Sequence, residues 1–200
     1  MDRKPITLAT SGFVTEYVSN AAANLGVRYL MLKPCDMTAL VERLEYFHAR
    51  GCKISDHGLA YMPFRPCTEE EANAIYQKAL RGEALTKDDI DGYQTTLLLH
   101  LGKAYRKLGV VMQIHYSVVR NLNGRIFKAM GPDAGIDGIA QNSCGYDITR
   151  FLSALEEEGG CPRTILYSLN PIDNAQLGTI IGCFQDASIP GKIQHGSAWW

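Results

Sequence analysis

Hydrophobic and polar positions along this chain follow two different periods. Short apolar runs rich in β-branched residues predict buried strands, and apolar residues repeated every three or four positions predict amphipathic helices. Four strands are predicted in this way, at residues 52–55, 110–115, 164–169 and 191–195.

Helices are predicted in the segments between these strands, at residues 12–24, 37–50, 68 onward, 86–108, 147–158 and 171–184. Thr68 and Thr86 each stand three positions before an acidic residue, which is the spacing of a capping box. Asp147 is expected to cap its helix, and Asn170 is expected to cap the helix that starts with Pro171.

Alternation of strands and helices predicts an α/β fold with a parallel sheet and right-handed crossovers. The two helices within residues 66–108 follow each other without a strand between them, so they form a helical excursion. Ligands bind such sheets at the carboxyl ends of the strands. The polar residues expected at that edge are Asp56, His57, His115, Asn170 and Ser197.

Residues 109–139 carry the strongest functional signal in the chain. His115 stands where the second predicted strand ends, and the segment after it is polar and rich in glycine. This connection is longer than most loops, and long loops are usually functional or disordered. A histidine at a strand end followed by such a loop indicates an enzyme active site.

Composition narrows the class of protein. The chain is 46% hydrophobic and 20% charged with a net charge of −1, which does not favour nucleic-acid binding. No apolar stretch approaches the roughly 20 residues of a membrane span, and the N-terminus lacks the apolar core of a signal peptide, so a cytoplasmic protein is expected. The six cysteines are scattered without a CxxC pair, which favours reduced thiols over disulfides or a zinc finger.

Four segments, at residues 51–58, 111–139, 164–185 and 191–200, resemble bacterial uronate isomerases, also called glucuronate isomerases, of the amidohydrolase superfamily. The resemblance covers essentially the whole chain, in order and spacing. It implies a TIM-barrel-like segment, with the four predicted strands as strands four to seven of a distorted (β/α)8 barrel. On that map residues 1–200 form one partial barrel domain, and the excursion at about 66–108 lies between the fourth and fifth barrel strands.

The resemblance also implies aldose–ketose isomerisation of D-glucuronate to D-fructuronate, and of D-galacturonate to D-tagaturonate, in hexuronate catabolism. The family binds a divalent metal, typically zinc, through a His-x-His pair on the first barrel strand and an aspartate on the last. This chain contains no His-x-His and is expected to end before the last strand. It therefore looks like the central part of the enzyme, with the metal ligands outside it.

His115 corresponds to the family's active-site histidine on the fifth strand, which implies a catalytic role, whereas from the residues alone a core histidine is an equal alternative. Arg120 and Asn121 form an Arg-Asn pair that is typical of the family the chain resembles. They either contact the substrate carboxylate or organise the loop by pairing with Asp133 or Asp137.

Adjacent strand residues face opposite sides, so only one of Asp56 and His57 can look into a barrel, and His57 is taken as a candidate substrate-binding residue. Trp199 and Trp200 either wall the sugar pocket or pack at the barrel edge.

Two other functions stay open. The chain could be a catalytically incomplete α/β fragment that acts only as an assembly or binding element. It could also be another amidohydrolase-like metal enzyme, although Tyr167 and Ser168 stand where hydrolytic relatives commonly place a metal-binding histidine. The expected partners are a hexuronate sugar and further copies of the chain, because a partial barrel exposes strand edges that favour self-association as a homo-oligomer.

Overall fold

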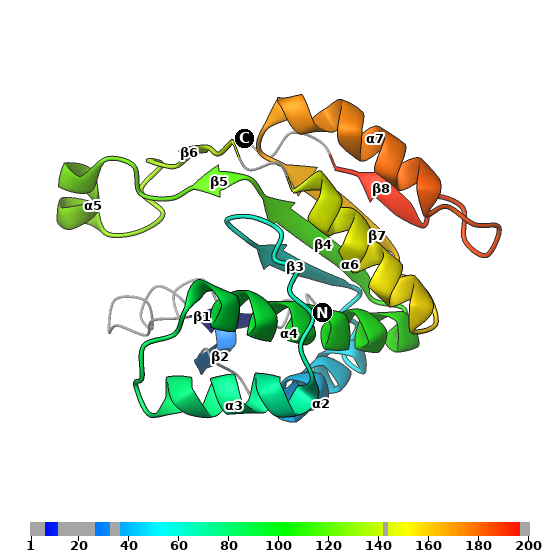
Figure 1. Ribbon diagram of the computed structural model, residues 1–200, viewed down its shortest axis with the longest axis horizontal. Helices are drawn as coiled ribbons and strands as arrows, with labels where there is room; N and C mark the ends of the chain where they lie inside the picture. Colours follow the sequence, from blue (N-terminus) through cyan, green and yellow to red (C-terminus); the bar gives the residue numbers. More distant parts are fainter. Residues whose placement is uncertain (1–6, 12–26, 33–36, 142–143, 197–200) are drawn as a thin grey trace, which may run out of the picture.

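The computed structural model of the chain describes residues 7–11, 27–32, 37–141 and 144–196 (Figure 1). At its centre is a four-stranded parallel sheet in the order β3–β4–β7–β8. The strands span Ile54–Gly58, Val111–Tyr116, Thr164–Ser168 and Ile193–His195. The α/β class and the parallel sheet predicted from the sequence are thereby confirmed.

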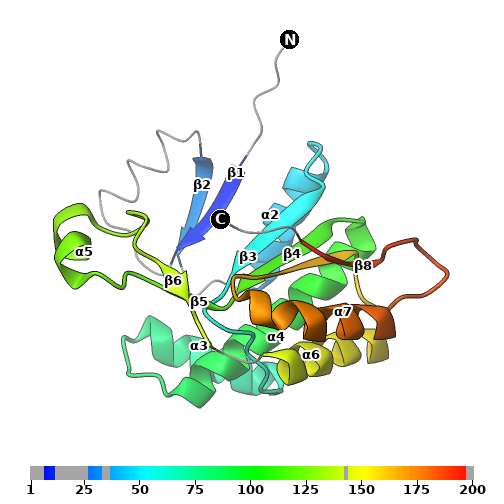
Figure 2. The same cartoon turned by 90° about the horizontal axis from the view of Figure 1, so that it is seen from above.

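Helices cover one face of this sheet. Figure 2 shows α4, α6 and α7 on the same side of it. The helices are α2 Met37–His48, α3 Glu69–Leu80, α4 Lys87–Leu108, α6 Gly145–Glu157 and α7 Asn174–Cys183, with a 3-10 turn, η1, at Pro171–Asp173. Apolar side chains of α2, α4, α6 and α7 meet alternate strand residues in one core, which includes Met112, Ile114, Leu152 and Leu166, while α3 packs against α4.

The caps explain where the helices begin. Thr86 forms a complete capping box at the start of α4, as predicted. At Thr68 only half of the predicted box forms: Thr68 accepts a hydrogen bond from Glu71 N, while the Glu71 carboxylate pairs with Arg65. The expected cap at Asp147 is wrong, because α6 begins two residues earlier, after Cys144. Asp147 lies instead in the first turn, where a carboxylate interacts favourably with the helix dipole.

Two more strands lie near the N-terminus, β1 at Thr7–Ser11 and β2 at Val27–Leu32, paired in parallel. The sequence-based count of four strands was therefore too low. β1 mixes hydroxyl and apolar residues, and β2 is a short run, apolar apart from Arg28, of a kind that periodicity alone cannot distinguish from a buried helix. The helix expected at 12–24 lies outside the described residues.

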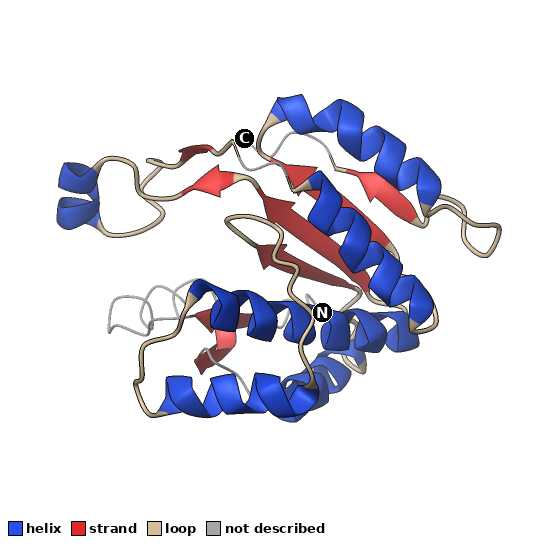
Figure 3. Ribbon diagram, viewed as in Figure 1, coloured by secondary structure: helices blue, strands red, loops and turns tan. Residues whose placement is uncertain are grey.

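The long connection after β4 is an extended arm, residues 118–139, and not an irregular loop. Two short antiparallel strands, β5 at Val118–Val119 and β6 at Gly138–Ile139, form its base, and helix α5 at Gly124–Met130 lies between them. Figure 3 shows the arm reaching away from the sheet. No residue of α5 is buried, so the arm is held mainly at its base.

Candidate active site at the carboxyl edge of the sheet

The strand ends of the sheet bring four residues into a row on the face opposite the helices. We call Asp56, His115, Tyr167 and Gly196 the edge row. His115 and Tyr167 are register partners on β4 and β7, and the register partner of His115 on β3 is Gly58. Asp56 lies two residues before Gly58, on the same face of β3, and Gly196 follows directly after β8. Because parallel strands end at the same edge, residues far apart in sequence meet here.

His115 is held from two directions within the edge row. Its Nδ1 lies 2.6 Å from Oδ1 of Asp56, and its ring stacks on Tyr167 with centroids 4.2 Å apart and planes 13° apart. A carboxylate only accepts hydrogen bonds, so Nδ1 is the donor and Nε2 is the ring nitrogen suited to exchange a proton with a ligand. The His115 side chain is 15% exposed and that of Asp56 is 60% exposed, so solvent reaches the pair.

Tyr167 is fixed in turn by Gly196. A Cβ atom added to Gly196 would lie 2.0 Å from Cε1 of the Tyr167 ring, so only glycine leaves room for the ring in this position. From the sequence alone, Tyr167 stands out only as the residue at a position where hydrolytic relatives commonly place a metal-binding histidine. Its place beside His115 depends on the register between β4 and β7, which is not readable from one strand.

His57 lies on the other face of the sheet. Its Nε2 is 3.1 Å from the hydroxyl of Tyr105, which is 4% exposed within the helical layer. Burial raises the pKa of Tyr105 to about 12, so this hydroxyl stays protonated at neutral pH. Asp56, and not the candidate His57, is therefore the residue of this strand that faces His115.

Arg120 organises the base of the arm and also reaches the sheet edge. Its Nη1 lies 2.5 Å from Oδ2 of Asp137 and 3.9 Å from Asp133, so the pairing considered from the sequence is present. Its Nη2 would be 3.7 Å from a Cβ atom on Gly58, at the end of β3. One arginine thus connects the arm to the strand end next to His115.

Asn121 contributes through its backbone. Its N–H donates to Oδ1 of Asp137 at 2.9 Å, and its φ of 57° gives it a left-handed conformation. Burial by itself would raise the pKa of Asp137, but the hydrogen bonds from Asn121 and Arg120 outweigh burial and lower it. Asp137 is therefore ionised and holds both residues. Trp199 and Trp200 lie outside the described residues.

A metal ion does not fit the donors that the described residues provide. No group of three or more His, Cys, Asp or Glu side chains among them is placed to hold one. Asp56 and His115 are two possible ligands that already bond to each other. Separately, none of the helices described is long and apolar enough to cross a membrane.

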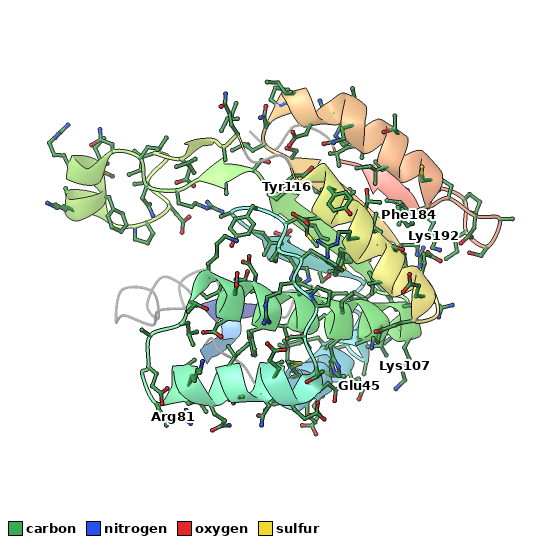
Figure 4. All side chains as sticks on the ribbon, viewed as in Figure 1. Glu45, Arg81, Lys107, Tyr116, Phe184 and Lys192 are labelled. Carbon is green, nitrogen blue, oxygen red and sulfur yellow. The ribbon has the colours of Figure 1, made fainter. Side chains whose placement is uncertain are left out.

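A cavity of about 840 Å³ lies at the opposite end of the sheet. Lys107 and Lys192 mark this end in Figure 4, and Arg106 and Arg163 also line the cavity. The carboxyl ends of α4 and α6 point toward it, and helix C-termini carry negative partial charge. Acidic side chains of the same lining pair with two of the basic ones, Glu158 with Lys103, and Glu156 and Asp186 with Lys192.

An Asp–His pair at the carboxyl edge of a parallel α/β sheet is an arrangement that α/β enzymes use for proton transfer. Comparison with known proteins gives the family. The family model for glucuronate isomerase matches residues 4–200, and the chain belongs to this family. The resemblance found in the sequence motifs is confirmed.

Individual relatives agree with this assignment. The chain is 48% identical to the uronate isomerase of Caldicellulosiruptor saccharolyticus over 164 residues, which are 82% of this chain and 35% of that protein. It is 42% identical to the uronate isomerase of Clostridium perfringens over 199 residues, which are 98% of this chain and 42% of that protein. The chain thus spans about two fifths or less of these relatives.

Solved structures are also similar to this chain. Uronate isomerase from Thermotoga maritima superposes with a TM-score of 0.73 at 28% identity, over 92% of this chain and 39% of that one. Glucuronate isomerase from Caulobacter crescentus gives a TM-score of 0.66 at 23% identity, over 82% of this chain and 33% of that one, which shows a shared fold.

Proposed function

We propose that the edge row is part of a hexuronate isomerase active site, which interconverts D-glucuronate with D-fructuronate and D-galacturonate with D-tagaturonate. The observation that carries the proposal is the hydrogen bond between Asp56 and Nδ1 of His115 at the carboxyl edge of the sheet. Family membership supplies the reaction class, and the Asp–His pair supplies a group suited to it.

Aldose–ketose isomerisation moves a proton between C2 and C1 and rearranges the protons on O1 and O2. An imidazole can both donate and accept a proton, which suits transfer between the oxygens O1 and O2. Asp56 fixes the tautomer of His115 and stabilises the imidazolium when Nε2 takes up a proton. Exchange with the sugar oxygens therefore goes through Nε2.

The remote carboxylate of a hexuronate needs a cationic partner. Arg120 is the arginine next to the edge row, and a guanidinium binds carboxylates through two parallel hydrogen bonds. Asp137 holds Arg120 in place at 2.5 Å, so that little conformational freedom is lost when the sugar binds. We assign Arg120 to this carboxylate and Asn121 to shaping the turn that presents it.

The sheet also fits a position within a larger barrel. The parallel order β3–β4–β7–β8 and the α3–α4 pair between β3 and β4 match strands four to seven of a (β/α)8 barrel with a helical excursion. On this proposal residues 1–200 are one partial barrel domain, and exposed strand edges favour self-association of the chain.

Turnover of D-glucuronate by the purified chain tests the function, with zinc added because the family resemblance implies a metal. We expect His115→Asn to lower turnover by about 10²–10⁴-fold, the usual size of a general acid–base contribution. His100→Asn, on α4, is the matched control and is expected to retain turnover. Undiminished turnover by folded His115→Asn would contradict the proposal.

A second function is favoured by one observation, the lack of a metal-binding group among the described residues. The chain then binds or assembles without catalysing isomerisation. Folded wild-type chain that shows no turnover with zinc, yet self-associates in sedimentation experiments, is the result expected for this alternative.

A further inference from the structure

The carboxylate of Asp173 lies beneath the edge row and takes no part in the chemistry proposed above. Asp173 is the last residue of η1, which follows β7 after Leu169 and Asn170, and it is 8% exposed. Its Oδ2 accepts hydrogen bonds from Ser168 Oγ at 2.5 Å and from Ser117 Oγ at 3.2 Å. Among the described residues, no cationic side chain forms an ion pair with it.

A buried carboxylate without a cation is unfavourable unless its hydrogen bonds compensate for lost hydration. Its charge also acts on neighbouring groups. The pKa of Tyr116 is raised mainly by burial and further by the negative charge of Asp173. The pKa of Cys144 is raised by the same two causes, with burial again the larger. The groups near Asp173 therefore stay neutral, and the hydrogen bonds from the two serine hydroxyls compensate for the hydration that its carboxylate loses on burial.

Ser117, one of the two serines, has a strained backbone conformation. It is fully buried, and its φ of 64° places it in the left-handed region, which is strained for residues other than glycine. Here the chain leaves β4 and enters the arm, and Ala140 N donates to Ser117 O at 2.9 Å. The bond to Asp173 holds the side chain of this turn.

Ser168 brings the second strand to the same carboxylate. It is the register partner of Tyr116, and Leu169 N donates to Tyr116 O at 3.0 Å. His115 precedes Tyr116 and Tyr167 precedes Ser168 along their strands. Asp173 thus connects the ends of β4 and β7 at positions next to the stacked rings of His115 and Tyr167.

We propose that Asp173 is a positioning residue: through Ser117 and Ser168 it sets the position of His115 against Tyr167 and the direction of the arm that carries Arg120. Its importance for catalysis rests on the function proposed above, but its effect on geometry does not. Asp173 touches neither the sugar nor the reacting atoms.

The test is NMR of the chain with ¹³C-labelled histidine, compared between wild type, Asp173→Ala and the control Asp147→Ala. Asp147 is a half-exposed carboxylate on α6, paired with Arg150. The ring current of Tyr167 sets the His115 ring signals, which the His115→Asn spectrum identifies. We expect Asp173→Ala to move these signals toward unstacked positions, and Asp147→Ala to leave them in place.

Amide hydrogen exchange adds a second readout at the strand ends. We expect Asp173→Ala to lower the exchange protection of Leu169 and Ala140 by about tenfold, roughly the effect of losing one charge-assisted hydrogen bond. A residue that only adds stability would lower the melting temperature without moving the His115 signals of the folded state. Unmoved signals and unchanged protection in folded Asp173→Ala would overturn the proposal.

Where Asp173→Ala does not fold, Asp173→Asn decides. Its amide oxygen can still accept one hydroxyl, so we expect a smaller displacement of the His115 signals in the same direction, and no displacement would overturn the proposal. These spectra contain no sugar. If D-glucuronate leaves the wild-type signals unmoved, the proposed function fails while the positioning role of Asp173 is still decided.

Discussion

The two faces of the central sheet are built by the same strands under different constraints. On β4, Met112 and Ile114 are 0% exposed and pack against the helices. Gln113 and His115 alternate with them and face the other way, where His115 meets Asp56 and Tyr167. The helix-covered face is fixed by close packing, whereas the open face is fixed by a few directional contacts.

This difference separates stability from chemistry within one strand. Close packing makes each buried side chain costly to shorten, while polar contacts that solvent reaches add little to folding. The open face can therefore carry charged and titratable groups without a large loss of stability. Substitutions on the covered face should consequently lower the free energy of unfolding more than substitutions on the open face.

The largest effect on folding is expected from Ile114→Ala on the covered face. Removing its buried side chain leaves a cavity, so we expect the free energy of unfolding to fall by about 2–5 kcal/mol. His115→Asn, the next residue, should change it by less than about 1 kcal/mol. Urea unfolding of both variants measures this, and equal losses would break the comparison between the faces.

Gly196→Ala should have the next largest effect, because its new Cβ atom would lie 2.0 Å from the Tyr167 ring. We expect a loss of about 1–3 kcal/mol in the free energy of unfolding and displacement of the His115 NMR signals. Gly182→Ala is a matched control on α7, where a Cβ atom meets nothing within 4 Å. If Gly196→Ala behaves like the control, the ring is not held by Gly196.

Alkaline pH should destabilise the covered face through Tyr105. Its pKa is raised by burial to about 12 from 10.0, so this stabilisation is complete below pH 10 and is lost as pH rises toward 12. At pH 11 we expect the wild type to lose about 1 kcal/mol of its free energy of unfolding through this group, and Tyr105→Phe to lack that loss. Melting temperatures at pH 9 and pH 11 measure it, and an identical alkaline loss in both proteins would refute the assignment.

The smallest effect is expected from Gly58→Ala at the open edge. The added methyl would meet Arg120 Nη2 at 3.7 Å, which is an ordinary contact. We expect the free energy of unfolding to change by no more than about 0.5 kcal/mol. Thermal unfolding measures this, and a loss of several kcal/mol would mean that the open edge is packed as tightly as the covered face.

Local patterns predicted much of this fold. Buried parallel strands are continuous apolar runs, so the four strands of the sheet were found, and the caps at Thr68 and Thr86 marked two helices correctly. The place of His115 near a strand end also followed from its own segment.

The rest depends on contacts between distant segments. The choice of Asp56 over His57 follows from the register between β3 and β4, which neither strand encodes alone. Asp173 meets Ser117 across 56 positions, and no local pattern links an aspartate in a helical turn to a serine after another strand. The sequence identified the edge where the site lies but not how its residues are held.

The most direct test is titration of D-glucuronate into the ¹³C-histidine-labelled chain, followed by NMR. We expect the signals of His115 to move in a saturable way, while those of His48 and His100 on the helices stay in place. Movement of the helical histidines without that of His115, or no movement at all, would contradict a hexuronate site at the edge row.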